Sequence, residues 1–234
     1  MENKSDLETY LLLSSEKKTI AVYDKQNLKN LYINNYNNKN KNQDLSNESV
    51  NYFLEKNIFT IEKRFHKFVE KINLILENNE FFDISISIKR NNYGEAITKD
   101  KIVHLLNEAK DECKKSMDGK KIVHMVIENY IIDEINYSFL PLDLKCNFFS
   151  LDIKFICLSK DYFKEIEKIL KRYQISINNI LQLDYVKQFL SDNQNDLYQM
   201  SMQIIDGYNK NEVLLVPKVT KNKGFFERFF NFFS

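Results

Sequence analysis

The chain has 234 residues, with 34 lysines and arginines against 33 aspartates and glutamates, and a formal net charge of +1. This length holds one large or two small domains with a proper core, and the near-neutral balance argues against a nucleic-acid partner. Three widely spaced cysteines and the lack of a signal-like apolar start predict a reducing, cytoplasmic compartment.

The first third of the chain predicts a meander followed by a helix. Strand-like runs cover Thr9 to Leu13, Lys18 to Tyr23 and Leu28 to Asn34, and the Asn-rich run Asn34 to Asp44 is interpreted as a surface loop. Apolar residues at helical spacing then predict one helix from Ile61 to Leu76. Its stripe comprises Ile61, Phe65, Phe68, Val69, Ile72, Ile75 and Leu76.

The middle of the chain predicts a compact α+β module of two helices on a small sheet. One helix begins after the N-cap Thr98 and runs to about Cys113, and the other begins after the N-cap Ser159 and runs to about Tyr173. The expected strands of the module are Ile122 to Ile132 and the alternating stretch Phe149 to Cys157. The alternating run Asp83 to Lys89 is expected to be a half-buried strand that precedes the module.

The end of the folded part predicts a strand, a short helix and a hairpin. The strand covers Ile175 to Leu183 and the helix Tyr185 to Leu190. Met202 to Asp206 and Val213 to Val216 are expected to be two strands around a turn at Gly207 to Asn211.

The last eleven residues, Gly224 to Ser234, contain six phenylalanines. On a helix these rings fall within an arc of roughly 160°, opposite the polar residues, and a helix of about 16 Å is too short to span a bilayer. We predict a membrane-binding segment, because burying one Phe side chain contributes about 1.5 to 3 kcal/mol. The residues expected to contact lipid are Phe225, Phe226, Phe229, Phe230, Phe232, Phe233, Lys221, Lys223 and Arg228. The competing interpretation is that this stripe docks on the protein's own core or in a partner's groove.

The sequence contains no motif typical of a catalytic, nucleotide-binding or metal-binding site. His66, His104 and His124 show no metal-ligand spacing and are interpreted as ordinary surface or boundary residues, and no P-loop, Gly-x-Ser-x-Gly or paired Cys-x-x-Cys occurs. We therefore expect no enzyme activity, no metal and no cofactor. Asp206 with Gly207 is a candidate vestigial metal or phosphate contact, although an Asp-Gly pair at a strand end is more often a turn former.

Several phrases in the sequence resemble the bacterial cell-division actin homologue FtsA. They are Ala96 to Ala109 (AITKDKIVHLLNEA), Ile122 to Glu134 (IVHMVIENYIIDE), Ile175 to Leu190 (ISINNILQLDYVKQFL), Met202 to Val216 (MQIIDGYNKNEVLLV) and the Phe-rich tail. The first two resemble the opening helix and the next strand of that family's small inserted module. The third resembles the return into the actin core, and the fourth stands where the second actin lobe begins.

The resemblance implies ATP and Mg²⁺ binding, but the two phosphate loops depart from the family's pattern. Leu12 to Lys17 (LLSSEK) has neither the Asp nor the Gly of the first loop, and Tyr208, Asn209 and Lys210 replace the glycines of the second. Backbone amides approach a phosphate closely only where side chains leave room. We therefore expect no ATP binding, and the missing remainder of the second lobe weakens the case for direct binding to the ring protein FtsZ.

The resemblance and the residue patterns together give one expected organisation. Residues 1–89 and 175–200 form a partial actin-like, ribonuclease H-like subdomain, and 90–174 form the inserted module. Residues 201–217 form the remnant of a second-lobe hairpin, and 218–234 form a linker and an amphipathic membrane-targeting helix.

The implied function is that of a non-catalytic adaptor at the cytoplasmic face of the bacterial inner membrane, at the division site. Its expected partners are membrane lipid, other division proteins and other copies of the chain. The alternative is a soluble actin-like scaffold of pilus or secretion assembly whose tail binds a partner protein. A third hypothesis is a residual ATPase with a remodelled loop.

Overall fold

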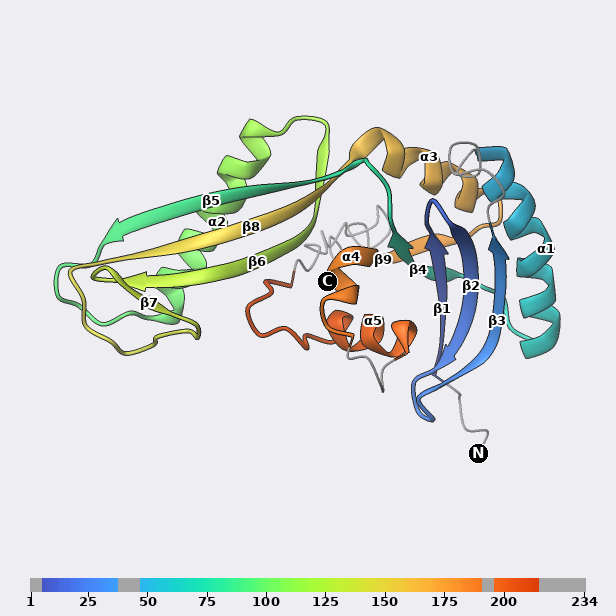
Figure 1. Cartoon of the computed structure of the whole chain (residues 1–234), viewed down its shortest axis with the longest axis horizontal. Coiled ribbons are helices and arrows are strands. Elements are labelled where there is room, and N and C mark those ends of the chain that lie inside the picture. Colours follow the sequence, from blue (N-terminus) through green and yellow to red (C-terminus); the bar gives the residue numbers. More distant parts are fainter. Residues whose placement is uncertain (1–5, 38–46, 191–195, 215–234) are drawn as a thin grey trace, which may run out of the picture.

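The structure is a computed structural model, and it describes residues 6–37, 47–190 and 196–214. Two sheets lie beside each other along the length of the molecule (Figure 1). The strands are β1 (Leu7–Leu13), β2 (Lys17–Asp24), β3 (Lys29–Asn37), β4 (Lys71–Leu76), β5 (Phe81–Asn91), β6 (Lys120–Ile132), β7 (Ile135–Tyr137), β8 (Phe148–Ser159) and β9 (Ser176–Gln182). The helices are α1 (Asn47–Phe65), α2 (Lys99–Ser116), α3 (Lys160–Lys171), α4 (Leu183–Lys187) and α5 (Leu197–Ile205).

The first sheet has five strands in the order β3-β2-β1-β4-β9. The pairs β1/β2 and β2/β3 are antiparallel, whereas β4 lies parallel to both β1 and β9. A meander followed by two parallel strands, each reached by a long connection, is the ribonuclease H-like order that the resemblance implied. The described chain is thus an α+β protein with a partial actin-like fold.

Alternating side chains build one core on each face of this sheet. Leu11, Leu13 and the other residues of that face pack against α1 and α3, while Tyr10 and Leu12 pack against α4 and α5. Because successive side chains of a strand point to opposite faces, a continuous buried run such as β1 serves both cores.

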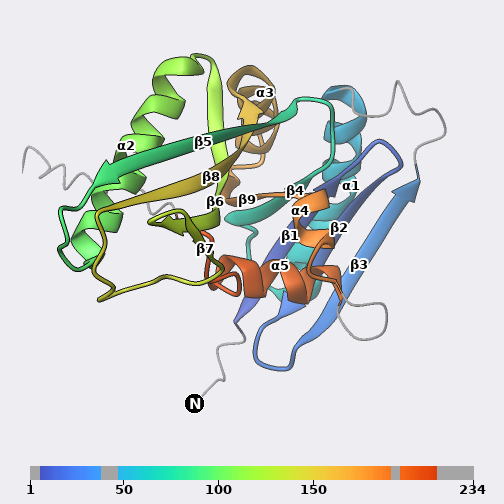
Figure 2. The ribbon, with the colours of Figure 1, turned by 60° about the vertical axis from the view of Figure 1, so that its left-hand side comes forward.

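The second sheet is antiparallel, in the order β5-β8-β6-β7, and is inserted between β4 and β9. The helix α2 covers one face and buries Ile102, Leu105, Ala109 and Cys113 there. Figure 2 shows α2 behind this sheet and the five-stranded sheet to its side. The N-cap expected at Thr98 is confirmed, since its hydroxyl accepts a hydrogen bond from the Lys101 backbone N–H. Ser159 precedes α3 as expected, but its side chain makes no capping hydrogen bond.

The helix predicted from Ile61 to Leu76 is wrong beyond Phe65. The helix α1 ends there, His66 adopts a left-handed φ of 51°, and the next apolar residues form β4. This strand is central in the sheet and buried on both faces, so its apolar run has no alternation. Such a run also satisfies helical spacing, which is why the two elements merged in the prediction.

The hairpin expected at Met202 to Val216 is also wrong. Met202 to Ile205 belong to α5, whose side chains are buried over most of its circumference. That burial gives the segment a continuous apolar run, which resembles a buried strand. Residues 215 and 216 of the expected second strand lie outside the described residues.

Three expected boundaries also differ from the structure. The strand β3 continues to Asn37, inside the run interpreted as a loop, and β5 belongs to the second sheet although residues 81–89 were assigned to the first subdomain. The third difference concerns α3, whose buried residues Ile166, Ile169 and Leu170 join the core beneath α1. An amphipathic stripe shows that a helix is packed but not on which sheet, so in the described chain the module carries α2 alone.

Candidate functional site: a groove between the two sheets

The predicted lipid-binding residues, from Lys221 to Phe233, lie outside the described residues. Their membrane contact stays a prediction. Within the described part of the chain, no helix has the length and apolar character needed to cross a membrane.

The hairpin that stands at the first phosphate loop is a tight turn. Ser14 N–H donates to the Lys17 carbonyl at 3.0 Å, and Lys17 N–H donates to the Ser14 hydroxyl oxygen at 3.0 Å. These two amides are therefore already used within the turn. The intervening Ser15 and Glu16 carry side chains where a phosphate loop has bare backbone.

The second candidate, Asp206 with Gly207, terminates α5 instead of forming a strand-end turn. Gly207 has a φ of +90° and donates to the Ile204 carbonyl, and Tyr208 N–H donates to the Gln203 carbonyl. These two bonds are the Schellman arrangement that closes many helices. The Asp-Gly pair thus has a local structural explanation.

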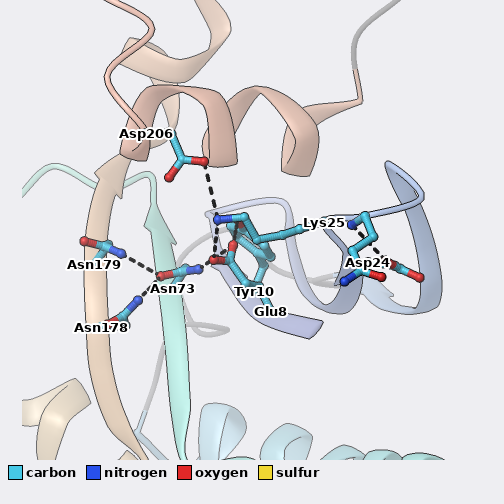
Figure 3. A network of polar contacts seen from close by, with 9 residues as sticks. Glu8, Tyr10, Asp24, Lys25, Asn73, Asn178, Asn179 and Asp206 are labelled. Atoms are coloured by element: carbon cyan, nitrogen blue, oxygen red, sulfur yellow. Dashed lines mark hydrogen bonds and ion pairs between the residues drawn. The ribbon is translucent and has the colours of Figure 1, made fainter. Parts of the chain in front are cut away.

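The carboxylate of Asp206 contacts a lysine. The Lys25 ammonium lies 3.4 Å from Asp206 Oδ2 and 3.3 Å from Glu8 Oε1 (Figure 3). Burial lowers the pKa of Lys25, but the two carboxylates outweigh it and the net pKa is raised. Among the residues that the structure describes, no group of three or more His, Cys, Asp or Glu side chains could hold a metal ion.

Behind this ion pair, a polar network crosses the first sheet. The hydroxyl of Tyr10 donates to Glu8 Oε2 at 2.5 Å, and Asn73 donates to the same oxygen at 3.3 Å. Asn178 and Asn179, on β9, both donate to the Asn73 side-chain oxygen (Figure 3). Burial, and then the Glu8 carboxylate, raise the pKa of the Tyr10 phenol. The network joins β1, β4 and β9 to the end of α5.

A groove with a volume of about 420 Å³ lies between the two sheets. One wall is β9, the edge strand of the first sheet, and the other is the first part of β6. Its apolar lining comprises Ile122, Val123, Phe163, Ile177, Ile180, Leu181, Ile204, Ile205, Val213 and Leu214. This lining is drawn from both sheets, from α3, and from α5 together with the segment after it.

The groove presents strand edges on both walls. The strand β9 pairs with β4 on one side only, and β7 pairs with β6 only at Tyr130–Ile132. Among the described residues, the edge of β6 from Lys120 to His124 therefore has no strand partner on the groove side. Unpaired edges with an apolar floor are the elements that bind an extended peptide by strand addition.

A buried polar cluster lies beside the groove, and two of its residues, His124 and Glu212, are part of the groove lining. The His124 side chain is 2% exposed; its Nε2 accepts from the Gln182 backbone N–H at 3.1 Å, so Nδ1 carries the proton and donates to Glu212 Oε1 at 2.7 Å. The Tyr185 hydroxyl donates to Glu212 Oε2 at 2.7 Å and accepts from Asn209 at 2.9 Å. Burial, and to a lesser extent Glu212, raise the pKa of Tyr185.

This cluster, which we call the His124 latch (His124, Tyr185, Asn209 and Glu212), connects three parts of the chain. His124 is on β6, Tyr185 on α4, and the other two residues follow α5. The backbone adds two bonds, Ile127 N–H to the Asn211 carbonyl at 2.9 Å and Val213 N–H to the Met125 carbonyl at 2.8 Å. The latch therefore fixes the segment after α5 against the second sheet.

The interpretation of all three histidines as surface or boundary residues is wrong for His124. His66 and His104 are exposed as expected. A signal for His124 was present in the sequence, because it lies in a run of β-branched and apolar residues within β6. Its carboxylate partner is 88 residues away, and no local spacing relates the two.

The sequence matches no protein-family model and no curated protein. Among solved structures, the cytoplasmic domain of EpsL, an inner membrane component of the type II secretion system of Vibrio cholerae, aligns with a TM-score of 0.38 and 9% identity over 81% of this chain and 60% of that chain. The PilM-PilN type IV pilus biogenesis complex aligns with a TM-score of 0.44 and 7% identity, over 78% of this chain and 49% of that chain. A Bacteroides thetaiotaomicron protein with an actin-like ATPase fold and unknown function aligns with a TM-score of 0.32 and 11% identity, over 79% of this chain and 56% of that chain.

All three alignments have TM-scores below 0.5 and identities of 11% or less. The chain spans about half to three fifths of the length of the three solved chains. The actin-like architecture of the described residues is defined by the order and direction of the strands in the first sheet. Nothing in the comparisons distinguishes a relative of FtsA from other actin-like proteins.

Proposed function

We propose that this chain is a non-catalytic scaffold of actin-like fold that binds an extended segment of a partner protein in the groove between its two sheets. The observation that carries the proposal is that two unpaired strand edges, β9 and the first part of β6, lie on opposite walls of an apolar groove of about 420 Å³. Backbone edges supply affinity for any extended chain, and side-chain pockets supply the selectivity.

The proposal that the scaffold is not an enzyme rests on the two places where an actin-like protein would cradle phosphate. The Ser14–Lys17 turn uses its own amides, and Asp206 with Gly207 closes a helix and contacts Lys25. Calorimetry with Mg-ATP tests this directly. Saturable heat at micromolar nucleotide would support the residual ATPase instead.

The scaffold is proposed to work at the cytoplasmic face of the bacterial inner membrane, held there by its Phe-rich tail. Replacing Phe226, Phe229 and Phe230 by Ser in the full chain removes three of the six rings and alters no residue of the described part of the chain. Co-sedimentation with vesicles should then fall by at least tenfold, since each buried ring contributes about 1.5 to 3 kcal/mol. Equal pelleting of parent and variant would exclude the anchor.

A photo-crosslinking side chain at Val123, inside the groove, tests the binding site in the native cell. The matched control places it at Val103, which is 53% exposed on α2. We expect a protein adduct from Val123 that disappears when Ile180, on the opposite wall, is changed to Lys. Adducts of equal yield from both positions, or an adduct that survives Ile180→Lys, would refute the groove as the site.

The identity of that adduct separates the two cellular roles. A cell-division protein would support the adaptor that the FtsA resemblance implies. A pilus or secretion component would support the alternative, which the fold of the chain accommodates equally well. In either case the chain contributes a docking platform and no chemistry of its own.

A further inference from the structure

A second hollow, with a volume of about 600 Å³, lies where the end of α2, the beginning of β6 and the first turns of α3 meet. Six lysines line it, together with one carboxylate, Glu167. They are Lys110, Lys114, Lys120, Lys121, Lys160 and Lys164. For a chain whose net charge is +1, this is a strong local concentration of positive charge.

Carboxylates neutralise only part of this charge. Glu167 is paired with Lys171, at 2.9 Å, outside the hollow. Asp118 lies 4.0 Å from Lys160 and Asp161 lies 3.5 Å from Lys164, and both carboxylates are almost fully exposed. The four remaining lysines, on α2 and β6, have no carboxylate partner among the residues described.

The floor of the same hollow is apolar. Met117, Ile122 and Phe163 contribute to it, and each is only partly buried by the rest of the protein. The Lys121 ammonium lies 4.5 Å from the centre of the Phe163 ring, so this lysine places its stem along the floor and its charge at the rim. Such an arrangement suits a ligand with a negative head and an apolar body.

We propose that this lysine-lined hollow binds the headgroup of an anionic phospholipid, with the first carbons of an acyl chain on the Met117–Ile122–Phe163 floor. The folded body then has a membrane contact of its own, separate from the Phe-rich tail. The inference does not depend on the groove, but it gives the proposed membrane location a second support. Several weak contacts on one molecule bind the same surface far more tightly than each does alone.

The apolar floor favours a lipid over other anions. A free phosphate or an acidic peptide would engage the ammonium groups but would leave the three apolar side chains in contact with water. A lipid satisfies both parts of the hollow, because its anionic headgroup attracts the ammonium groups and its acyl carbons cover the apolar floor.

The test uses the full chain and vesicles of phosphatidylcholine with or without one third phosphatidylglycerol. In the test variant, Lys110→Gln and Lys114→Gln remove two lining charges that do not contact the groove. In the control variant, Lys99→Gln and Lys115→Gln remove two charges from the same helix that do not line the hollow. Circular dichroism verifies that both variants are folded.

We expect the test variant to bind the anionic vesicles on the order of tenfold or more weakly than the parent, and the control variant to change by less than threefold. Binding to pure phosphatidylcholine, which depends on the tail, should be equal in all three proteins. Equal losses in both variants would show diffuse attraction and would overturn the site, as would no loss in either.

Two soluble probes distinguish the sources of the anion. A short-chain phosphatidylglycerol below its micelle concentration should raise the melting temperature of the parent but not that of the test variant. Glycerol phosphate, which has no acyl chain, should have at least tenfold lower affinity. Equal affinity would assign the hollow to a free phosphate, and tight binding of an acidic peptide in place of the lipid would assign it to a protein; either result overturns the proposal.

Lys121, Ile122 and Phe163 line both the groove and the hollow. Binding of the Phe-to-Ser tail variant to pure phosphatidylcholine and the protein adduct at Val123 still report on the proposed function alone, because neither readout depends on an anionic lipid in the hollow. If Lys110→Gln with Lys114→Gln leaves vesicle binding unchanged while the tail variant and the crosslink behave as expected, only the lipid site is refuted. If this α2 variant binds anionic vesicles more weakly but the tail variant and the crosslink fail, the proposed function is refuted and the lipid site stands.

Discussion

Removing the carboxylate of the His124 latch should destabilise the protein by a large fraction of its total stability. The change Glu212→Ala leaves the Nδ1–H of His124 and the hydroxyl of Tyr185 without an acceptor, and Glu212 is 8% exposed. Each buried donor left without a partner costs about 1 to 3 kcal/mol, so the expected loss is about 2 to 6 kcal/mol. Domains of this kind are stable by about 5 to 15 kcal/mol.

A double-mutant cycle separates the hydrogen bond from the loss of packing. The changes are His124→Ala, Glu212→Ala and both together, and urea unfolding followed by circular dichroism gives the free energy of each. Because the carboxylate is charged and buried, we expect a coupling energy of about 1.5 to 3 kcal/mol between His124 and Glu212. The slope of the unfolding free energy with urea should be the same in all four proteins.

The exposed pair Lys115 and Glu112 is the matched control for this cycle. Its atoms are 2.6 Å apart, close to the 2.7 Å of the latch, but its side chains are 71% and 51% exposed. Exposed pairs of this kind couple by about 0.3 to 0.5 kcal/mol. Equal coupling in the two cycles would refute the reasoning, since burial is the only cause invoked for the difference.

Three further predictions concern the helix ends and the polar network. Thr98→Ala should lower the unfolding free energy by about 1 kcal/mol, because it removes a capping hydrogen bond. The Ser159 hydroxyl makes no such bond, so Ser159→Ala should change the unfolding free energy by less than about 0.5 kcal/mol. Similar losses for both variants in urea unfolding would contradict this prediction. Gly207→Ala should cost about 1 to 2 kcal/mol in the same assay through its φ of +90° alone, because an added Cβ meets only ordinary contacts, and an unchanged midpoint would show that the turn relaxes. The stabilisation by Lys25, whose pKa its carboxylate partners raise, is fully present below the ordinary lysine value of 10.5 and is lost as pH rises through the raised value. The difference in unfolding free energy between the parent and Lys25→Met should therefore narrow above that pH, and a constant difference would show that the ion pair contributes nothing.

The sequence predicted best the elements that have one buried face. β5 alternates, as DISISIK indicated, and α2 begins at its N-cap and buries the expected stripe. In such elements the period of apolar residues reflects local geometry, so it identifies the type of element without knowledge of the rest of the fold.

The wrong elements are those that are buried on more than one side. β4 lies between two strands and under cores on both faces, and α5 packs against both the first sheet and α4. Their apolar residues form continuous runs, and a continuous run does not distinguish a strand from a helix. Only the pairing of β4 with β1 and β9, which is non-local, decides between the two.

The groove and the latch were beyond sequence reasoning for the same physical reason. Their residues come from β6, β9, α4 and the segment after α5, and they meet only because the second sheet is inserted between β4 and β9. The insertion places the edge of β6 near the edge of β9, and Gln182 N–H donates to His124 across the two. Apolar side chains of both strands line the groove.

This arrangement couples the groove to the end of the described chain. Glu212 bonds to His124, and both line the groove together with the adjacent Val213 and Leu214. A bound peptide would therefore contact the segment that leads to the predicted membrane anchor. Since a ligand shifts an equilibrium only by its differential contacts with the two states, Val213 and Leu214 are the residues through which groove occupancy could alter the tail. Leu214 is 52% exposed, so replacing it by Ser removes such contacts with little cost in stability. We expect this change to weaken the effect of groove occupancy on vesicle binding by the tail.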